Sequence, residues 1–157
     1  MTQLNPKKIK IDSKKISNQK LINIQNLRKR VLYKKLPIYY SKYPQDNFPN
    51  TKYVNLYVKK KIVSTLTFFP NDLSYKKKFK SIQIRGMATD ERFQNKGYGA
   101  KIIFHLFDYA LKNSFDIIWC NARKESHQFY KSCGFTKVRD FFFIRNIGLH
   151  ILMFKKL

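Results

Sequence analysis

The sequence predicts a single α/β domain over residues 1–157, with a mostly antiparallel central sheet and helices on both faces. Short apolar segments of strand length alternate along the chain with segments whose apolar residues recur at helical spacing. No internal repeat or linker divides the sequence. A chain of this size can bury about 70% of the surface of its unfolded state, so one hydrophobic core is enough for the whole chain.

The first third of the chain contains a basic start, a short strand and one helix. We expect residues 1–8 to be loosely structured, after which Ile9 and Ile11 alternate with polar residues as in a strand. Apolar residues recur at helical spacing from Leu21 to Leu32, which predicts a helix over 18–32. Prolines then interrupt the segment from 37 to 49, which favours irregular structure.

A hairpin and a third strand are predicted next. Strands over 52–58 and 62–69 are joined by a lysine-rich turn, and a polar loop over 70–80 leads into a strand over 81–89. Regular alternation in this last strand places two sets of residues on opposite faces. One set is Ile82, Ile84, Gly86 and Ala88, and the other is Gln83, Arg85, Met87 and Thr89.

A glycine-bearing loop, Gln94-Asn95-Lys96-Gly97-Tyr98-Gly99, joins that strand to a helix predicted over 97–113. At such a junction the unpaired N–H groups and the positive end of the helix dipole favour an anion. Gly97 and Gly99 allow the backbone to approach it closely. A glycine pair alone can be only a tight turn. The loop lacks the third glycine of a dinucleotide site and the Gly-Lys-Ser/Thr of a triphosphate site.

The remaining third of the chain continues the alternation of strands and helices. We expect a strand over 115–121, a short helix over 123–133 and two last strands over 135–143 and 149–156. The helix ends in Phe129-Tyr130-Lys131-Ser132-Cys133-Gly134-Phe135, in which Gly134 suits the left-handed stop of a helix.

Two of these motifs together resemble a known family. The pattern Gln/Arg-x-x-Gly-x-Gly/Ala at 94–99 resembles the coenzyme A pyrophosphate loop of the GNAT (GCN5-related N-acetyltransferase) superfamily, and 129–135 is similar to its Phe-Tyr-x-x-x-Gly-Phe signature. The resemblance implies the GNAT fold, an α/β fold with about seven strands and about four helices. Further segments resemble one bacterial group of GNAT proteins that lacks a settled substrate, namely 27–28, 31–32, 85–89, 119–123 and 147–150.

The resemblance implies an acetyl-CoA-dependent N-acetyltransferase that acts on a primary amine without a metal. The loop and the start of its helix would hold the pyrophosphate, and the edge of the strand over 81–89 would bind the pantetheine arm. A backbone N–H at Ala88 or its neighbour would polarise the thioester. Arg123 stands where a typical member has Asn. The implied donor site comprises Met87, Ala88, Thr89, Gln94, Asn95, Lys96, Gly97, Tyr98, Gly99, Asn121 and Arg123.

Tyr130 and His150 are the candidate catalytic residues. By its place in the motif, Tyr130 would protonate the departing thiolate; the alternative is a tyrosine packed in the core with its hydroxyl in water. His150 lies on a predicted strand and could act as the general base for the amine. A structural histidine is the alternative for His150, and a water chain could replace a dedicated base.

The acceptor is less constrained by the sequence. Arg28 and Arg85 are candidate acceptor-binding residues, which would suit a small amine that also carries a carboxylate. A protein acceptor is the second form of the same hypothesis. The resemblance also implies a homodimer paired through the last strands, and the apolar run 141–144 is compatible with this, although core packing would explain the run equally well.

The formal net charge of +24 supports a rival hypothesis from another functional class. Such a charge attracts polyanions, so the chain could be a catalytically inactive GNAT-fold module that binds nucleic acid or the ribosome. Against this, the basic residues are scattered, their runs fall in predicted turns, and no recognised nucleic-acid motif is present. We therefore rank the enzyme first.

The apolar runs and cysteines narrow the remaining choices. No apolar run approaches the length of a membrane span, and the basic start lacks the apolar core of a secretory signal, so we expect a cytoplasmic protein without membrane contact. Cys120 and Cys133 occur in apolar contexts and are predicted to be small packed side chains.

Overall fold

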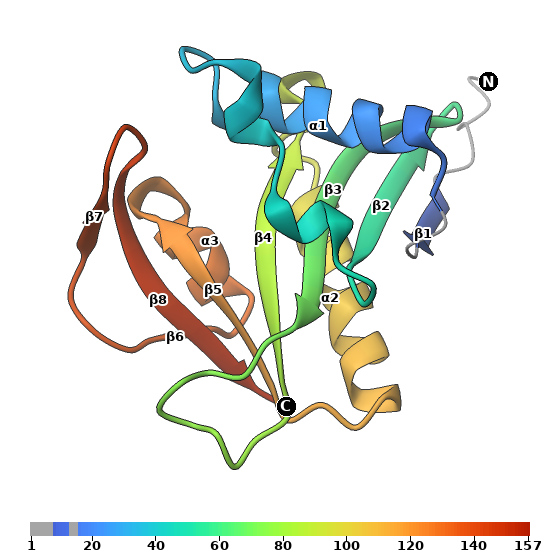
Figure 1. Cartoon of the computed structure of the whole chain (residues 1–157). Coiled ribbons are helices and arrows are strands. Elements are labelled where there is room, and N and C mark those ends of the chain that lie inside the picture. The colour runs from blue at the N-terminus through green and yellow to red at the C-terminus, as the bar shows by residue number, and fades with distance from the viewer. Residues whose placement is uncertain (1–7, 13–15) are drawn as a thin grey trace.

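The computed structural model describes residues 8–12 and 16–157, and these residues form one eight-stranded sheet with three α-helices (Figure 1). The strand order is β1-β2-β3-β4-β5-β8-β6, and β7 pairs with β8. All neighbours run antiparallel except β4 and β5, which are parallel. The strands are β1 Lys8–Asp12, β2 Lys52–Val58, β3 Lys61–Pro70, β4 Ser81–Thr89, β5 Ile117–Arg123, β6 Thr136–Lys137, β7 Phe142–Ile144 and β8 Gly148–Lys156.

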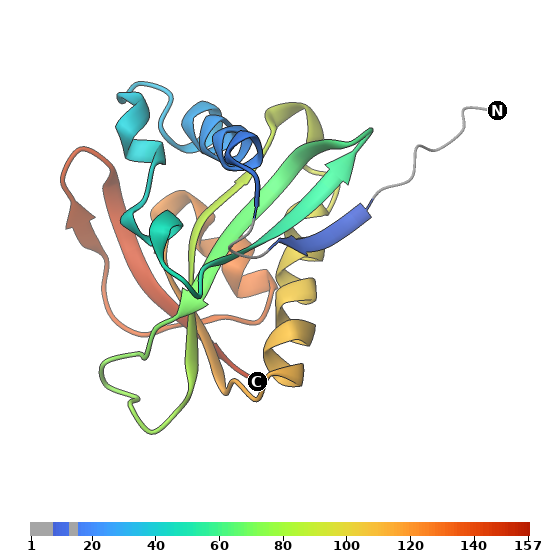
Figure 2. The ribbon, with the colours of Figure 1, turned by 45° about the vertical axis from the view of Figure 1, so that its right-hand side comes forward.

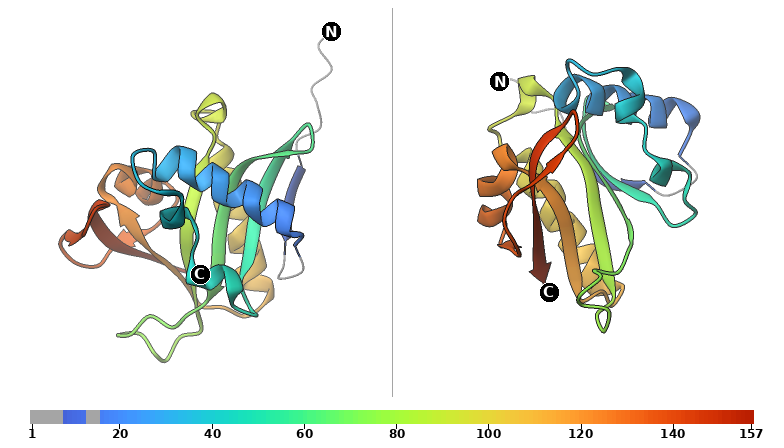
Figure 3. Two further views of the ribbon diagram at one scale, coloured as in Figure 1. Left: turned by 45° about the horizontal axis from the view of Figure 1, so that its top comes forward. Right: turned by 60° about the vertical axis from the view of Figure 1, so that its left-hand side comes forward.

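The helices cover both faces of this sheet. They are α1 Asn18–Leu32, α2 Tyr98–Lys112 and α3 His127–Ser132. In Figures 2 and 3, α1 crosses one face of β2–β4 while α2 lies against the other. The core between the sheet and α2 also includes Tyr130 of α3, so α2 and α3 share a face. The predicted class, a mostly antiparallel α/β fold, is confirmed, with eight strands where about seven were expected and three α-helices where about four were.

The stripe predicted for the helix after the glycine loop forms the centre of the core. Ile102, Ile103 and Leu106 are fully buried between α2 and the sheet, as their helical spacing requires. Cys120 and Cys133 are also buried, which confirms them as small packed side chains. None of the helices within the described residues is long and apolar enough to cross a membrane.

A β-bulge in β4 overturns the predicted alternation of that strand. Thr65 pairs with Ala88 and Thr67 with Arg85, so two β4 residues, Gly86 and Met87, stand opposite one β3 residue. Gly86 has φ +62°, and a Cβ built there would lie 2.5 Å from Cε2 of Tyr43. The predicted grouping of Arg85 with Met87 on one face is therefore wrong. Arg85 stacks on Tyr43, whereas Met87 packs into the core beneath α2 and α3.

The two parallel strands separate past their paired half. Backbone pairing between β4 and β5 covers only Ser81–Ile84 against Ile117–Cys120. Beyond these residues β4 runs toward α1 and β5 toward α3, and Figure 1 shows the resulting V. The unpaired strand edges of the V are available to a ligand.

The end of the chain departs from the prediction. The single strand predicted over 135–143 is two short strands, β6 and β7, joined by a loop. Phe141, Phe142 and Phe143 are exposed, with Phe143 the most exposed at 70%, so core packing does not explain the apolar run. Of residues 1–8, predicted to be loose, Lys8 begins β1 and 1–7 lie outside the described part of the chain.

Candidate active site

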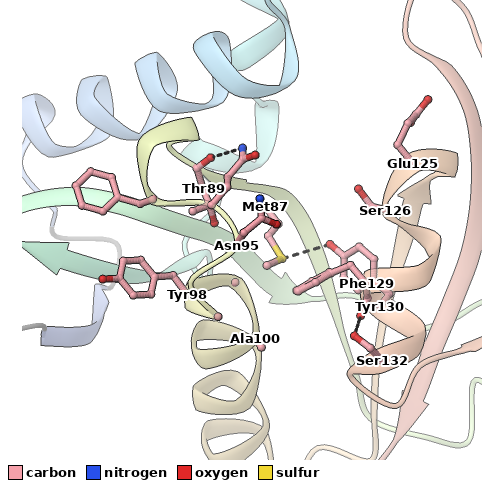
Figure 4. A pocket seen from close by; sticks show the side chains of 14 residues that line it. Met87, Thr89, Asn95, Tyr98, Ala100, Glu125, Ser126, Phe129, Tyr130 and Ser132 are labelled. Atoms are coloured by element: carbon pink, nitrogen blue, oxygen red, sulfur yellow. Dashed lines mark hydrogen bonds between the residues drawn. The ribbon is translucent and has the colours of Figure 1, made fainter.

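Two cavities open in the V between β4 and β5, and three residues line both of them. The first has a volume of about 560 Å³ and the second about 260 Å³. The shared residues are Met87 on β4, Ser126 before α3 and Tyr130 on α3. Figure 4 shows the first cavity, with Met87 facing Tyr130 across it. Molecules in the two cavities would therefore meet beside Met87, Ser126 and Tyr130.

The glycine-bearing loop forms one wall of the first cavity. Asn95 has φ +57° and Gly97 has φ +73°, and Gly97 is the N-cap of α2. No atom lies within 4 Å of a Cβ built at Gly97, so its φ rather than lack of space favours glycine. The first N–H groups of α2 have no carbonyl of their own helix to bond, and the helix dipole adds positive potential there. This wall therefore suits an anion.

Close packing favours a glycine at the second glycine position of the loop for another reason. A Cβ at Gly99 would lie 3.0 Å from Cε of Met87 and 3.2 Å from Cζ of Phe129. Gly99 thus lets α2 approach β4 and α3 closely enough to form the corner of the cavity. Gln94 fixes the other end of the loop, because its Nε2 donates to the carbonyl of Thr89 at 2.9 Å.

Most of the predicted donor residues line the first cavity, and four do not. Met87, Thr89, Gln94, Asn95, Gly97, Tyr98 and Gly99 line it. Lys96 is exposed and lies over the ring of Phe93 at 5.4 Å, outside the lining. Ala88 pairs with Thr65 and lines neither cavity, whereas its neighbour Met87 lines both. Asn121 and Arg123 line the second cavity instead.

Tyr130 holds its hydroxyl at the border between the two cavities. The hydroxyl donates to Sδ of Met87 at 3.5 Å, and the residue is only 6% exposed. Burial, and secondarily the neighbouring thiol of Cys120, hold the pKa of Tyr130 well above its ordinary value. The hydroxyl therefore stays protonated at neutral pH, as a proton donor must be before it acts.

His150 is buried in the wall of the second cavity, on β8. Its Nδ1 lies 2.8 Å from the carbonyl oxygen of Gly148, which can only accept, so Nδ1 carries the proton in the neutral ring. Nε2 is then the nitrogen that accepts protons. Burial lowers the pKa of His150 below its ordinary value, the bond to Gly148 opposes this, and the charge of Arg123 adds to the lowering. The ring is thus neutral at pH 7.

Arg28 does not reach either cavity, so its predicted contact with an acceptor is wrong. The side chain is fully buried beneath α1. Its Nη1 and Nη2 donate to the two carboxylate oxygens of Asp46 at 2.8 and 3.0 Å, and Nη1 also donates to the carbonyl of Ser41. Its guanidinium lies 4.1 Å from the ring centre of Tyr43, which packs against Gly86. Arg28 therefore supports the bulge and does not bind an acceptor.

Several residues of the second cavity were not predicted from the sequence. Tyr33 at the end of α1 lines it and bonds the buried hydroxyl of Tyr43 at 2.8 Å. The end of β7 contributes Ile144, and the turn between β7 and β8 contributes Ile147 and contacts Tyr40 through a hydrogen bond from Asn146 at 2.9 Å. Only Gly86 carried a sequence signal, because a glycine inside a strand pattern often marks a bulge.

Comparisons with known proteins agree on one family. The family model for the acetyltransferase (GNAT) family matches residues 19–135. The chain is 27% identical over 131 residues to the uncharacterized N-acetyltransferase YitI of Bacillus subtilis (strain 168), which covers 83% of this chain and 88% of YitI. An acyl-CoA N-acyltransferase from Pseudomonas aeruginosa superposes with a TM-score of 0.79 at 16% identity, over 96% of this chain and 99% of that one. An aminoglycoside 6′-N-acetyltransferase complexed with coenzyme A superposes with a TM-score of 0.74 at 10% identity, over 95% of this chain and 96% of that one.

Proposed function

The chain belongs to the acetyltransferase (GNAT) family of acyltransferases, and on this premise we propose that it transfers the acetyl group of acetyl-CoA to a primary amine of a small molecule. The observation that carries the proposal is the position of Tyr130, whose hydroxyl stands between an anion-favouring cavity and a cavity that holds a neutral histidine. A donor and an acceptor entering from opposite sides would meet at this hydroxyl.

The first cavity suits the donor. The pyrophosphate of acetyl-CoA would bind the backbone of 95–99 at the start of α2, as an anion does at a helix N-terminus. The structural neighbour complexed with coenzyme A supports a ligand of this kind on this fold. The pantetheine arm would follow the unpaired edge of β4 and bring the thioester to Met87. Of the predicted pair, Ala88 or its neighbour, the backbone N–H at Met87 in the bulge would polarise the thioester carbonyl.

The second cavity suits the acceptor and the proton transfers. A neutral amine attacks the thioester carbonyl, and Nε2 of His150 takes the proton that the new amide nitrogen must lose. The tetrahedral intermediate then expels the coenzyme A thiolate. Tyr130 gives its proton to that thiolate and regains one from solvent. The volume of about 260 Å³ favours a small molecule over a folded protein surface as the acceptor.

The rival hypothesis, an inactive module that binds nucleic acid, leaves these features without a purpose. It requires neither a glycine at φ +73° at the start of α2 nor a buried tyrosine hydroxyl between two cavities. The net charge of +24 is its only support, and charge acts on any polyanion, including coenzyme A.

Calorimetric titration with acetyl-CoA tests the donor site, with two substitutions at one position. Gly97→Glu and Gly97→Gln impose the same backbone strain and place side chains of similar size in open space. Only glutamate adds a negative charge beside the expected pyrophosphate. We expect one-site binding to the native chain, and affinity at least ~10-fold weaker for Gly97→Glu than for Gly97→Gln, since one such charge interaction amounts to ~1–2 kcal/mol.

Equal affinities for the two variants would contradict the placement of the pyrophosphate. Absence of binding to the native chain at both low and moderate salt would overturn the proposed function itself. If instead the native chain binds only at low salt and binds RNA at least as well, its charge is the better guide to function.

A further inference from the structure

The second cavity is cationic and contains no acid. Arg85 and Arg123 line it beside the neutral ring of His150, and none of its lining residues is Asp or Glu. The protonated form of an amine is the form that predominates in neutral solution, and this cavity would repel it. An amine that enters must therefore bring a compensating negative charge or pass as the rare neutral form.

Arg85 and Arg123 differ from the three arginines that form ion pairs, and they are half-buried, whereas Arg139 and Arg145 are exposed. Arg28 bonds Asp46, and Arg30 and Arg92 both bond Asp90. Neither Arg85 nor Arg123 forms an ion pair with any acid of the described residues, although both side chains are half-buried. A half-buried guanidinium without a counter-ion is costly unless something else compensates its charge.

Neutral partners hold both guanidinium groups in place. Arg85 lies over the ring of Tyr43 at 4.3 Å, and its Nη1 donates to Oε1 of Gln45 at 2.8 Å. Arg123 lies over the ring of Tyr33 at 5.1 Å. Because Tyr33 and Tyr43 are themselves joined by a hydrogen bond, the two arginines stand on one aromatic support. Their N–H groups not used in these contacts are oriented but uncompensated.

We infer that the acceptor is an amine that also carries a carboxylate, which Arg123 and Arg85 bind while the amine faces His150. Arg123 on β5 is the register partner of His150 on β8, so the anion-binding group and the base stand side by side in the cavity wall. A guanidinium binds a carboxylate better than it binds neutral or cationic groups, because it is positively charged and offers paired hydrogen-bond donors in one plane. The cavity should reject polycations such as aminoglycosides for the same reason.

This inference rests on the proposed function, so the experiment first tests donor binding separately from the choice of acceptor. Acetyl-CoA affinity is measured by calorimetry for every variant, and only variants that bind the donor normally are then assayed for acetylation. Loss of donor binding in the native chain would count against the proposed function. The acceptor test begins once donor binding is established.

The acceptor assay compares free L-amino acids, and β- and γ-amino acids, with their own carboxamides and with kanamycin. Each pair has the same carbon skeleton and the same amine, and differs only in the carboxylate. We expect at least one acid to be acetylated, with a kcat/KM about 10- to 100-fold above that of its amide. Charge-assisted hydrogen bonds to the carboxylate can account for a preference of this size. The amine of an amide loses its proton more readily, so intrinsic reactivity works against the expected preference.

Three variants show whether the arginines cause the preference. Arg123→Gln and Arg85→Gln should each lower the ratio of kcat/KM between an acid and its amide by at least about 10-fold. A merely structural role would lower both values together and leave the ratio unchanged. Arg139→Gln is the matched control, because Arg139 is exposed over Tyr75 and lines neither cavity.

Three outcomes would overturn the inference while the proposed function stands. The first is acetylation of amides or kanamycin as fast as the acids. The second is an acid-to-amide ratio that both arginine variants leave unchanged. The third is normal acetyl-CoA binding with no acid of the panel acetylated.

Discussion

The two cavities are built from different parts of the chain, although they share one wall. One wall of the first is a backbone loop that leads into the start of a long helix. The second depends on half-buried side chains from α1, β4, β5 and the β7–β8 turn, held by stacking and by hydrogen bonds. A site made of backbone tolerates change in its side chains, whereas a site made of side chains is altered by each substitution. If the proposed function is right, the donor site should therefore tolerate side-chain changes that the acceptor site does not.

Substitution of the shared wall should give the largest effect, because it removes a group that serves both cavities. Tyr130→Phe deletes only the hydroxyl, so we expect kcat to fall about 10²- to 10⁴-fold while the affinity for acetyl-CoA is unchanged. Steady-state kinetics measures kcat, and calorimetry measures the affinity for acetyl-CoA. Tyr109→Phe on α2 is the control, because Tyr109 packs on Phe68 outside both cavities. Full activity in Tyr130→Phe would remove the proton donor from the mechanism.

Substitution of Gly86, where Tyr43 and Arg28 support the bulge, should give the next largest effect, in this case on stability. Gly86→Ala places a Cβ 2.5 Å from Tyr43 and 3.0 Å from Nε of Arg28, at φ +62°. We expect the free energy of unfolding to fall by about 2–4 kcal/mol, the sum of backbone strain and overpacking. Gly97→Ala has a similar φ but open space around it, so it should cost only about 1 kcal/mol of strain.

Urea denaturation of the two alanine variants measures this difference. Equal costs would mean that Tyr43 moves aside easily, and the bulge would then not be held from beneath. In that case, the second cavity would be less ordered than its contacts suggest.

Loss of the base should affect the acceptor side alone. His150→Gln is expected to lower kcat/KM about 10- to 100-fold, toward the lower end of what a general base contributes, with acetyl-CoA affinity unchanged. Because burial lowers the pKa of His150 below 6.5, the neutral ring persists to lower pH than in a free histidine. Protonation of the amine itself lowers kcat/KM at higher pH, and titration of His150 should add a second fall below pH 6.5, which should disappear in the variant.

The lowered pKa of His150 also makes the stability of the folded chain depend on pH. The unfolded chain takes up a proton at His150 near pH 6.5, and the folded chain takes it up only at lower pH. Acidification through this window therefore favours the unfolded state, and His150→Gln should weaken that dependence. A second fall in kcat/KM below pH 6.5 that persists in the variant would assign the base to water or to another group.

The smallest effect should come from the corner of the donor cavity. Gly99→Ala brings a methyl group 3.0 Å from Cε of Met87, the flexible end of a side chain that can shift. We expect acetyl-CoA affinity to fall only about 3- to 10-fold, because the loop backbone is untouched and a shift of a few tenths of an ångström relieves the contact. Calorimetric titration measures this affinity. A larger loss would mean that Met87 is fixed by its contact with Tyr130.

The sequence by itself determined the fold class, the anion-favouring loop and the tyrosine between the cavities. These features are local: helical spacing from 102 to 110, glycines at 97 and 99, and the motif 129–135 can each be recognised within a few residues. The positions of α1, α2 and β2–β4 followed from such patterns to within one or two residues.

Only the tertiary structure decided the second cavity. Whether an arginine is buried against Asp46, like Arg28, or lines a cavity without an acid, like Arg123, depends on residues far apart in the chain. The bulge at Gly86 reversed the faces of β4, since one extra residue turns every later side chain to the other side. The partner of a charged side chain is set by packing, which no local pattern encodes.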